Sequence, residues 1–133
     1  MTEPSRGLLD TSVVIDLATI DPSLLPDETC IAAVTLAELA AGPHAAQDVE
    51  ERARRQDRLQ WAAATWDPLP FDADVARMYG RVFAAVRTSG RATRPRLADL
   101  FIAATAAAHA LPLYTRNVSD FAGLDELVVV RSI

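Results

Sequence analysis

Short apolar runs alternate along the chain with longer stretches of helical periodicity. The runs that predict buried strands are 7–9, 29–33, 111–115 and 127–130. The stretches that predict helices are 11–17, 35–41, 44–65, 73–87 and 96–110. Strands that alternate with helices in this way predict an α/β sandwich built around a mostly parallel sheet.

The clearest helical pattern follows Asp72, which is placed to cap a helix. Four residues of this helix recur at i, i+4, i+7 and i+11 and predict one buried face: Val75, Tyr79, Val82 and Val86. Arg77 and Arg81 are expected on the opposite side. Residues 88–95 predict a loop, and the pair Gly42-Pro43 predicts the end of the helix that begins at Thr35.

The composition indicates a globular chain with one domain over residues 1–133. Half of the 133 residues are hydrophobic, and charged residues are spread throughout the sequence. No apolar run reaches the roughly 18 residues of a membrane-spanning helix, so no membrane association is expected. The single cysteine, Cys30, cannot form an internal disulfide, which fits a protein of the reducing cytoplasm.

The basic residues add two constraints. All 13 are arginine, and the absence of lysine excludes chemistry that depends on a lysine, such as a P-loop or a Schiff base. The formal net charge of −5 argues against nucleic-acid binding by the chain as a whole. Residues 75–91, however, hold four arginines and no acidic residue, and Arg94 and Arg96 follow closely, so the average conceals a basic segment.

Four acidic residues lie in apolar stretches of the sequence: Asp10, Glu38, Asp99 and Asp120. A carboxylate in apolar surroundings is costly unless a positive group compensates it, and a hard divalent cation is one such group. Asp10 follows the first predicted strand, at the end where open α/β sheets bind ligands. If the fold brings the four together, the sequence predicts a metal site.

Each acid also has a structural alternative, and these stay open. Asp10 is suited to capping the helix that follows it. Glu38 completes a capping box with Thr35, and Asp120 can cap a local turn. Asp99 is the hardest to explain structurally, because the helix that follows it is apolar nearly all round.

The whole chain resembles the PIN-domain family of ribonucleases, in particular the small toxins of VapBC toxin–antitoxin pairs. The resemblance rests on four segments in order: 8–16 (LLDTSVVID), 34–39 (VTLAEL), 97–104 (LADLFIAA) and 114–121 (YTRNVSDF). It implies a PIN-like three-layer α/β/α sandwich with a short, mostly parallel sheet of four to five strands. It also implies a metal-dependent endoribonuclease.

The resemblance assigns the candidate site. The first three acids of the family correspond to Asp10, Glu38 and Asp99. The fourth varies between the position of Asn117 and an acid slightly later, and Asp120 is chosen here because Asn117 is neutral. Three further residues are expected to support the cluster by hydrogen bonding or orientation: Ser12, Thr115 and Asn117. Carboxylate oxygens suit Mg²⁺, or Mn²⁺ as an alternative, whereas His44, His109 and Cys30 form no zinc ligand set.

The resemblance also implies partners. RNA is the expected substrate, and the candidate RNA-binding residues are Arg87, Arg91, Arg94, Arg96 and Arg116. A cognate antitoxin is expected, together with a homodimer or a larger toxin–antitoxin assembly. Trp61, Trp66 and the helix at 35–41 are possible contact surfaces, although a core role is the preferred expectation for each.

Two alternatives compete with the ribonuclease. One is a PIN-like module that binds RNA or protein without catalysis, which the retained acids disfavour. The other is a receiver-type signalling domain, which the missing lysine disfavours.

Overall fold

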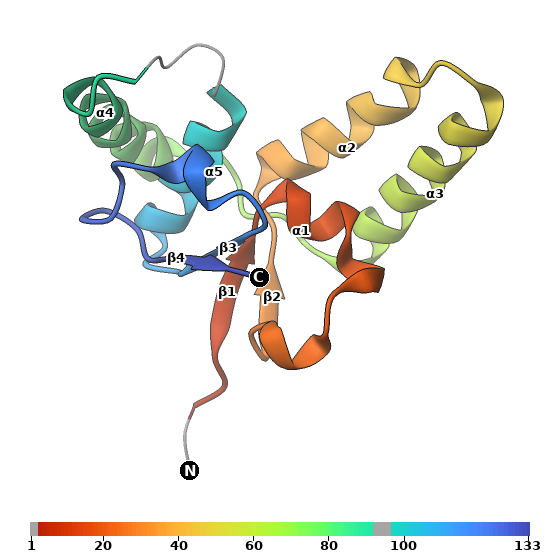
Figure 1. The fold of residues 1–133 in the computed structure, drawn as a ribbon, viewed down its shortest axis with the longest axis horizontal. Helices are drawn as coiled ribbons and strands as arrows, with labels where there is room; N and C mark the ends of the chain where they lie inside the picture. The colour runs from red at the N-terminus through yellow and green to blue at the C-terminus, as the bar shows by residue number, and fades with distance from the viewer. Residues whose placement is uncertain (1–2, 92–96) are drawn as a thin grey trace.

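The computed structural model describes residues 3–91 and 97–133. Within them lies a four-stranded parallel sheet with the strand order β2-β1-β3-β4 (Figure 1). The strands are β1 (Arg6–Leu9), β2 (Glu28–Cys30), β3 (Leu113–Thr115) and β4 (Val130–Ser132). Leu8 in the centre of the sheet pairs with Cys30 on one side and Leu113 on the other. The expected parallel sheet is confirmed.

The helices are α1 (Thr11–Ile15), α2 (Ala33–Ala45), α3 (Val49–Thr65), α4 (Ala73–Thr88) and α5 (Leu97–Ala108). Short 3-10 turns lie at Leu17–Thr19, Pro22–Leu24 and Val118–Phe121. No helix in the described ranges is long and apolar enough to cross a membrane.

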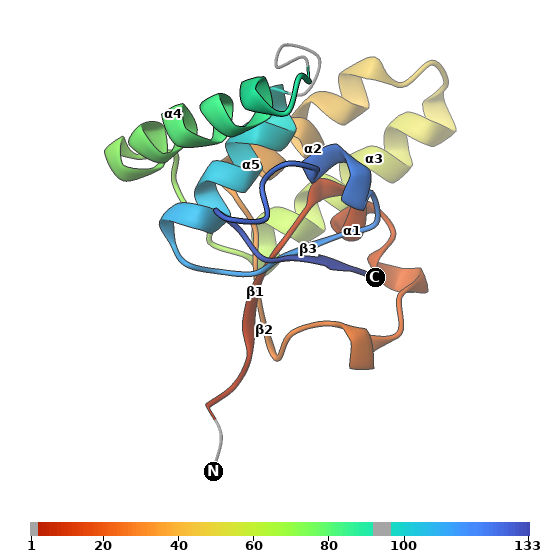
Figure 2. The same cartoon turned by 60° about the vertical axis from the view of Figure 1, so that its left-hand side comes forward.

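Two hydrophobic clusters lie on opposite faces of the sheet. Neighbouring residues of a strand point to opposite faces, and both Leu8 and Leu9 of β1 are fully buried. Leu8 packs in a cluster with residues of α4 and α5, whereas Leu9 packs with residues of α1, α2 and α3. The molecule is therefore a three-layer sandwich, as predicted (Figure 2).

Helix α4 forms as the periodicity predicts. The Asp72 carboxylate accepts a hydrogen bond from the Val75 backbone N–H at 3.1 Å and caps the helix. Val75 and Val82 are fully buried, whereas Tyr79 is only half-buried. Both Arg77 and Arg81 are exposed, as expected.

The predicted end of the second long helix is wrong. Helix α2 runs through Gly42 and Pro43 to Ala45, and Pro43 is buried. Arg55 of α3 donates a hydrogen bond from Nη1 to the Gly42 carbonyl oxygen at 2.9 Å. Packing against α3 thus overrides a local termination signal.

The last strand is displaced from the apolar run 127–130 that predicted it. The backbone N–H groups of Leu127 and Val128 donate to the Leu124 carbonyl oxygen at 2.9 and 3.0 Å, so this part of the run is a turn. Val128 is nevertheless buried, and β4 begins only at Val130. The run is apolar because it packs into the core, which a turn can do as well as a strand.

Candidate metal centre

The sheet topology places three of the predicted polar positions at one edge. Asp10 follows β1 directly, Thr115 is the last residue of β3, and Asp120 lies in the 3-10 turn that comes next. Because all strands are parallel, their carboxyl ends share one edge of the sheet. Helix α2 leaves the same edge after β2 and carries Glu38 in its second turn.

Asp99 reaches this edge from the other direction. Residues 109–112 join the last turn of α5 to the amino end of β3. The first turn of α5 therefore lies at the opposite end of the helix, towards the carboxyl ends of the strands. Asp99, in that first turn, is about 14 Å along the helix axis from Ala108. Helix α5 contacts both α2 and the 3-10 turn Val118–Phe121 (Figure 1). The elements that carry Glu38, Asp99 and Asp120 therefore surround the end of β1.

The Asp10 carboxylate is the most buried of the four acids, with 4% of the residue exposed. Its Oδ2 accepts hydrogen bonds from Ser12 Oγ at 2.7 Å and from Thr115 Oγ1 at 2.8 Å. Asp10 does occupy the N-cap position of α1, but its side chain makes no capping hydrogen bond. The capping alternative thus explains why Asp10 stands at the start of α1, but it does not explain the hydrogen bonds of its carboxylate.

Two backbone amides orient the hydroxyls that hold Asp10. The N–H of Arg116 donates to Ser12 Oγ at 3.2 Å, and the N–H of Asn117 donates to Thr115 Oγ1 at 3.0 Å. Each hydroxyl therefore accepts from the backbone and gives its single proton to the carboxylate. The predicted contacts of Ser12 and Thr115 are present, whereas Asn117 takes part through its backbone.

The capping-box alternative for Glu38 is wrong. Helix α2 begins at Ala33 with Ala32 as its N-cap, so Thr35 lies inside the helix. Glu38 is exposed, although Leu39 beside it is buried. Glu38 Oε1 accepts a hydrogen bond from Thr11 Oγ1 at 2.6 Å. This contact turns the carboxylate towards the start of α1, next to Asp10.

Thr11 and Thr35 are two further residues of this region that the sequence did not reveal. Their hydroxyl oxygens lie 3.0 Å apart, and Thr35 is fully buried. The sequence feature that pointed to Thr11 is the run of polar residues 10–12 directly after a buried strand. In the first turn of α1, Thr11 faces α2 while Ser12 faces β3, so consecutive hydroxyls serve two different carboxylates.

Asp99 and Asp120 are both half-buried. The N–H of Asp120 donates to the carbonyl oxygen of Asn117 at 3.0 Å. The two candidates for the fourth site residue, Asn117 and Asp120, therefore belong to one short turn. The choice between them stays a prediction.

The donor chemistry of this edge fits a hard divalent cation. Across residues 3–91 and 97–133, no three acidic, histidine or cysteine side chains are close enough to form a complete metal cage. Mg²⁺ does not require one, because it is commonly held by one or two carboxylates and keeps several waters. Asp10 and its hydroxyl partners offer only oxygen atoms. His44 and His109 are both exposed.

The candidate RNA-binding arginines have different environments. Arg116 forms an ion pair with Asp16 at 3.4 Å. Arg91 donates to the Ala122 carbonyl oxygen at 3.2 Å, and Arg87 lies over the Phe83 ring. Arg94 and Arg96 fall outside the described residues.

A hollow of about 400 Å³ opens beside Glu38. Its lining includes Thr11 and Glu38 on the site side and Glu51, Arg55 and Arg58 from α3. Hydrogen bonds from Arg54 and then Arg55 hold the pKa of Glu51 below its usual value. The side of the hollow formed by α3 therefore carries both a negative charge, on Glu51, and positive charges, on Arg55 and Arg58.

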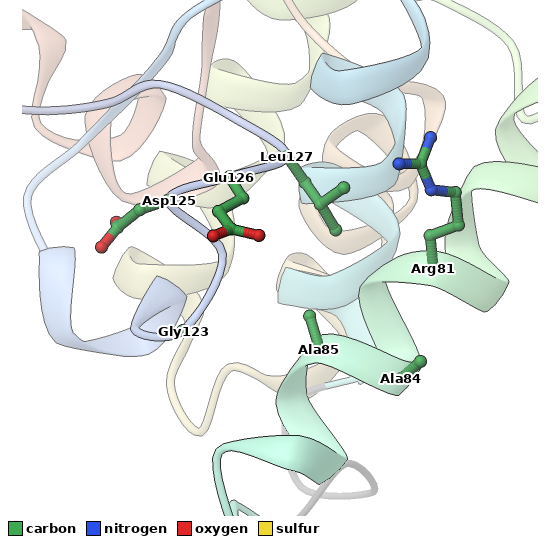
Figure 3. A pocket seen from close by; sticks show the side chains of 7 residues that line it. All are labelled: Arg81, Ala84, Ala85, Gly123, Asp125, Glu126 and Leu127. Atoms are coloured by element: carbon green, nitrogen blue, oxygen red, sulfur yellow. The ribbon is translucent and has the colours of Figure 1, made fainter.

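A larger hollow of about 550 Å³ lies between α4 and the segment 123–127 (Figure 3). It is lined by Arg81, Ala84 and Ala85 on one side and by Gly123, Asp125, Glu126 and Leu127 on the other. None of the four predicted acids lines it, so size alone does not identify the reactive site.

Comparisons with known proteins agree with this geometry. The family model described as PIN domain matches residues 7–127. The chain is 43% identical to Ribonuclease VapC5 of Mycobacterium tuberculosis, covering 99% of this chain and 97% of that protein. It is 36% identical to VapC ribonuclease Y4jK of Sinorhizobium fredii, covering 89% and 93%.

Solved structures extend the likeness. The crystal structure of VapBC-5, a member of the VapBC family of toxin-antitoxin systems from Mycobacterium tuberculosis, matches with a TM-score of 0.83 and 44% identity over 98% of both chains. FitAcB from Neisseria gonorrhoeae matches with a TM-score of 0.65 and 28% identity over 92% of this chain and 94% of that one. With its fold, its buried aspartate and the family match over residues 7–127, this chain belongs to the PIN domain family.

Proposed function

We propose that this protein is a metal-dependent endoribonuclease and the toxin of a VapBC-type toxin–antitoxin pair. One observation carries the proposal: Asp10 is buried at the carboxyl edge of the sheet, held by two oriented hydroxyls, with no ion pair to any basic residue in the described ranges. Burying a carboxylate without a positive partner costs several kcal/mol, which a bound cation offsets. The names of the two ribonuclease relatives and the toxin–antitoxin structures support the same activity.

The proposed cofactor is Mg²⁺, with Mn²⁺ as a substitute. Asp10 and Asp99 would be its main ligands, and Glu38 and Asp120 would bind a second ion or position coordinated water. When bound, such an ion activates a water molecule and stabilises the negative charge that develops on phosphorus during hydrolysis.

The protein residues contribute orientation and proton transfer. Ser12 and Thr115 both donate to Oδ2 of Asp10, so Oδ1 is the carboxylate oxygen that we assign to a cation. Thr11 fixes Glu38 at the solvent-exposed side of the cluster. Glu38 is thus placed to accept the proton of the attacking water and release it to solvent.

The test is cleavage of total RNA by the purified protein, with the cleavage ends mapped. Cleavage at defined positions is expected with Mg²⁺, is expected to stop with EDTA, and should return when Mg²⁺ is restored. Cleavage that continues undiminished in EDTA would contradict the metal-dependent mechanism. RNA binding without any cleavage would instead favour the non-catalytic module.

We further propose where the antitoxin binds. Ile15 and Trp61 are 45% and 44% exposed, which corrects the expected core role of Trp61. They line an apolar hollow of about 390 Å³ between α1 and α3. Trp66, by contrast, is half-buried and donates from Nε1 to Thr29 Oγ1 at 3.0 Å, a structural role as expected.

This apolar hollow continues towards the site. It shares Ile15 and Arg58 with the hollow beside Glu38. A protein segment that fills both hollows would lie against Glu38 and cover that side of the acidic cluster. We propose that this inhibition occurs in the cytoplasm, where the unpaired Cys30 stays reduced, and within a toxin dimer or a larger assembly.

Replacement of Ile15 by Glu is expected to weaken antitoxin binding by at least tenfold, because it buries a charge in the apolar hollow. The measurement is titration of the co-expressed, separated antitoxin into the toxin by calorimetry. The matched control is Val49→Glu, at a position 81% exposed at the start of α3 that is not among the residues lining either hollow. Equal affinity for the two variants would place the antitoxin elsewhere.

A further inference from the structure

Arg58 of α3 is half-buried between two hollows. It lines the hollow beside Glu38 and also the apolar hollow between α1 and α3. It forms no ion pair and no side-chain hydrogen bond with any residue in the described ranges. A guanidinium group is a planar cation with five N–H donors. Arg58 therefore presents a positive charge whose hydrogen bonds are not used by the described part of the chain.

The other charged residues on the α3 side of the hollow compensate one another. Glu51, Arg55 and Arg58 lie on one face of α3, at i, i+4 and i+7. Glu51 Oε1 accepts a hydrogen bond from Arg55 Nε at 2.9 Å, and Glu51 Oε2 accepts from Arg54. Arg55 also donates to the Gly42 carbonyl oxygen. Of the two arginines that line this hollow, Arg58 is thus the one whose charge is available to a ligand.

Arg58 lies opposite Glu38 across the hollow. Helices α2 and α3 are joined by residues 46–48 and pack side by side in opposite directions (Figure 1). Gly42 and Arg55 mark one level at which the two helices meet. From that level, Glu38 lies four residues back, about 6 Å along α2, and Arg58 lies three residues forward, about 4.5 Å along α3. Because the helices are antiparallel, both displacements have the same direction, and the two side chains lie at nearly the same level.

This arrangement suits an anion that lies beside the acids. Glu38 is held on the side of the hollow next to Asp10 by its hydrogen bond from Thr11. Arg58 forms no ion pair with Glu38, so the hollow stays open between them. An RNA strand with its scissile phosphate at the proposed metal continues into such a space with its next phosphate. A guanidinium group binds phosphate well, because two parallel N–H groups can each donate to one of its oxygens.

We propose that Arg58 is a substrate-binding residue that holds an RNA phosphate next to the scissile one, on the Glu38 side of the acidic cluster. The proposal rests on the ribonuclease function proposed above and deepens it. It directs one arm of the RNA strand into the hollow between α2 and α3. An antitoxin segment that fills both hollows would also cover Arg58, so the substrate and the antitoxin would compete for one side chain.

The test is binding of a fluorescein-labelled 12-nucleotide RNA of mixed sequence by the full-length protein, measured by anisotropy without divalent ions. Arg58→Met is expected to lower the affinity about tenfold, as for the loss of one charged hydrogen bond. The slope of log K against log salt should fall by about 0.7, the value for one phosphate contact on a single strand. Arg58→Lys keeps the charge, so it should keep the slope and lose only part of the affinity. The matched control is Arg52→Met, because Arg52 is an exposed arginine of the same helix that lines neither hollow.

Cleavage kinetics separate substrate binding from other roles of Arg58. A phosphate that does not react is bound equally in the ground state and the transition state, so Arg58→Met should raise KM about tenfold and leave kcat near the wild-type value. Methionine keeps an apolar stem beside the apolar hollow, so the melting temperature should stay near that of the wild type. Wild-type RNA affinity in Arg58→Met would overturn the proposal, and so would a fall in kcat with an unchanged KM. An equal loss of affinity in Arg52→Met would also overturn it.

Two further outcomes distinguish this proposal from its neighbours. If Arg58→Met keeps its RNA affinity but binds the antitoxin less tightly in calorimetry, Arg58 is a contact for an acidic antitoxin segment and the proposal fails. A wild-type protein that binds RNA through Arg58 but never cleaves it with Mg²⁺ would sink the proposed ribonuclease function and leave the phosphate contact standing. A wild-type protein that binds no RNA and cleaves none would overturn both.

Discussion

Asp10→Asn is expected to lower the rate of RNA cleavage by roughly a thousandfold or more. The variant loses the charge that would bind the metal, and losing one preorganised electrostatic contact already costs about 10²–10³ in rate. The amide oxygen can still accept the hydrogen bonds of Ser12 and Thr115, so the fold should persist. The measurement is the initial rate at saturating Mg²⁺, together with the melting temperature.

The control for this experiment is Asp16→Asn. Asp16 ends the same helix, but it is exposed and paired with Arg116. The Asp16→Asn variant should cleave RNA at close to the wild-type rate. Turnover by Asp10→Asn that matches Asp16→Asn would exclude Asp10 as a metal ligand. Asp99→Asn is expected to follow Asp10→Asn, since the same mechanism requires both carboxylates.

Thr115→Val is expected to lower activity about 10–100-fold, the usual cost of removing a group that orients a metal ligand. The side chain is fully buried and valine has nearly the same shape. The substitution therefore removes one of the two donors to Asp10 and leaves the Asn117 N–H without its acceptor. The free energy of unfolding should fall by about 1–3 kcal/mol as well.

The informative measurement on Thr115→Val is a Mg²⁺ titration. If Thr115 positions Asp10 for a cation, the Mg²⁺ concentration at half-maximal rate should rise. A variant with lower stability but an unchanged Mg²⁺ dependence would reduce Thr115 to a structural residue. Ser12→Ala removes the other donor from a less buried position and should shift the Mg²⁺ dependence in the same direction.

The positions of the elements could be predicted where local periodicity and tertiary packing agree. Helix α4 is an example, since its buried stripe and its Asp72 cap are both encoded within one segment. Helix α2 is the opposite case. Its Gly42-Pro43 pair signals an end, but Arg55 and the packing against α3 hold the helix past it. That contact joins residues 13 positions apart and has no signature in the local sequence.

The candidate site divides in the same way. Asp10 could be predicted because a charged residue at the end of a buried strand is visible in the sequence itself. The importance of Thr11 could not, because its hydroxyl finds Glu38 only through the packing of α1 against α2. The misplaced start of α2 also made Glu38 resemble a capping residue, although its carboxylate faces Thr11.

The hydrogen bond between Thr115 and Asp10 joins residues 105 positions apart. A growing chain on the ribosome has made Asp10 and Ser12 long before it makes β3. Until β3 docks on β1, Asp10 lacks its second hydroxyl, and the 3-10 turn that carries Asp120 has no strand to follow. Under the proposed mechanism, a toxin built in this order gains a complete site only when β3 and the turn after it have been made, late in its own synthesis.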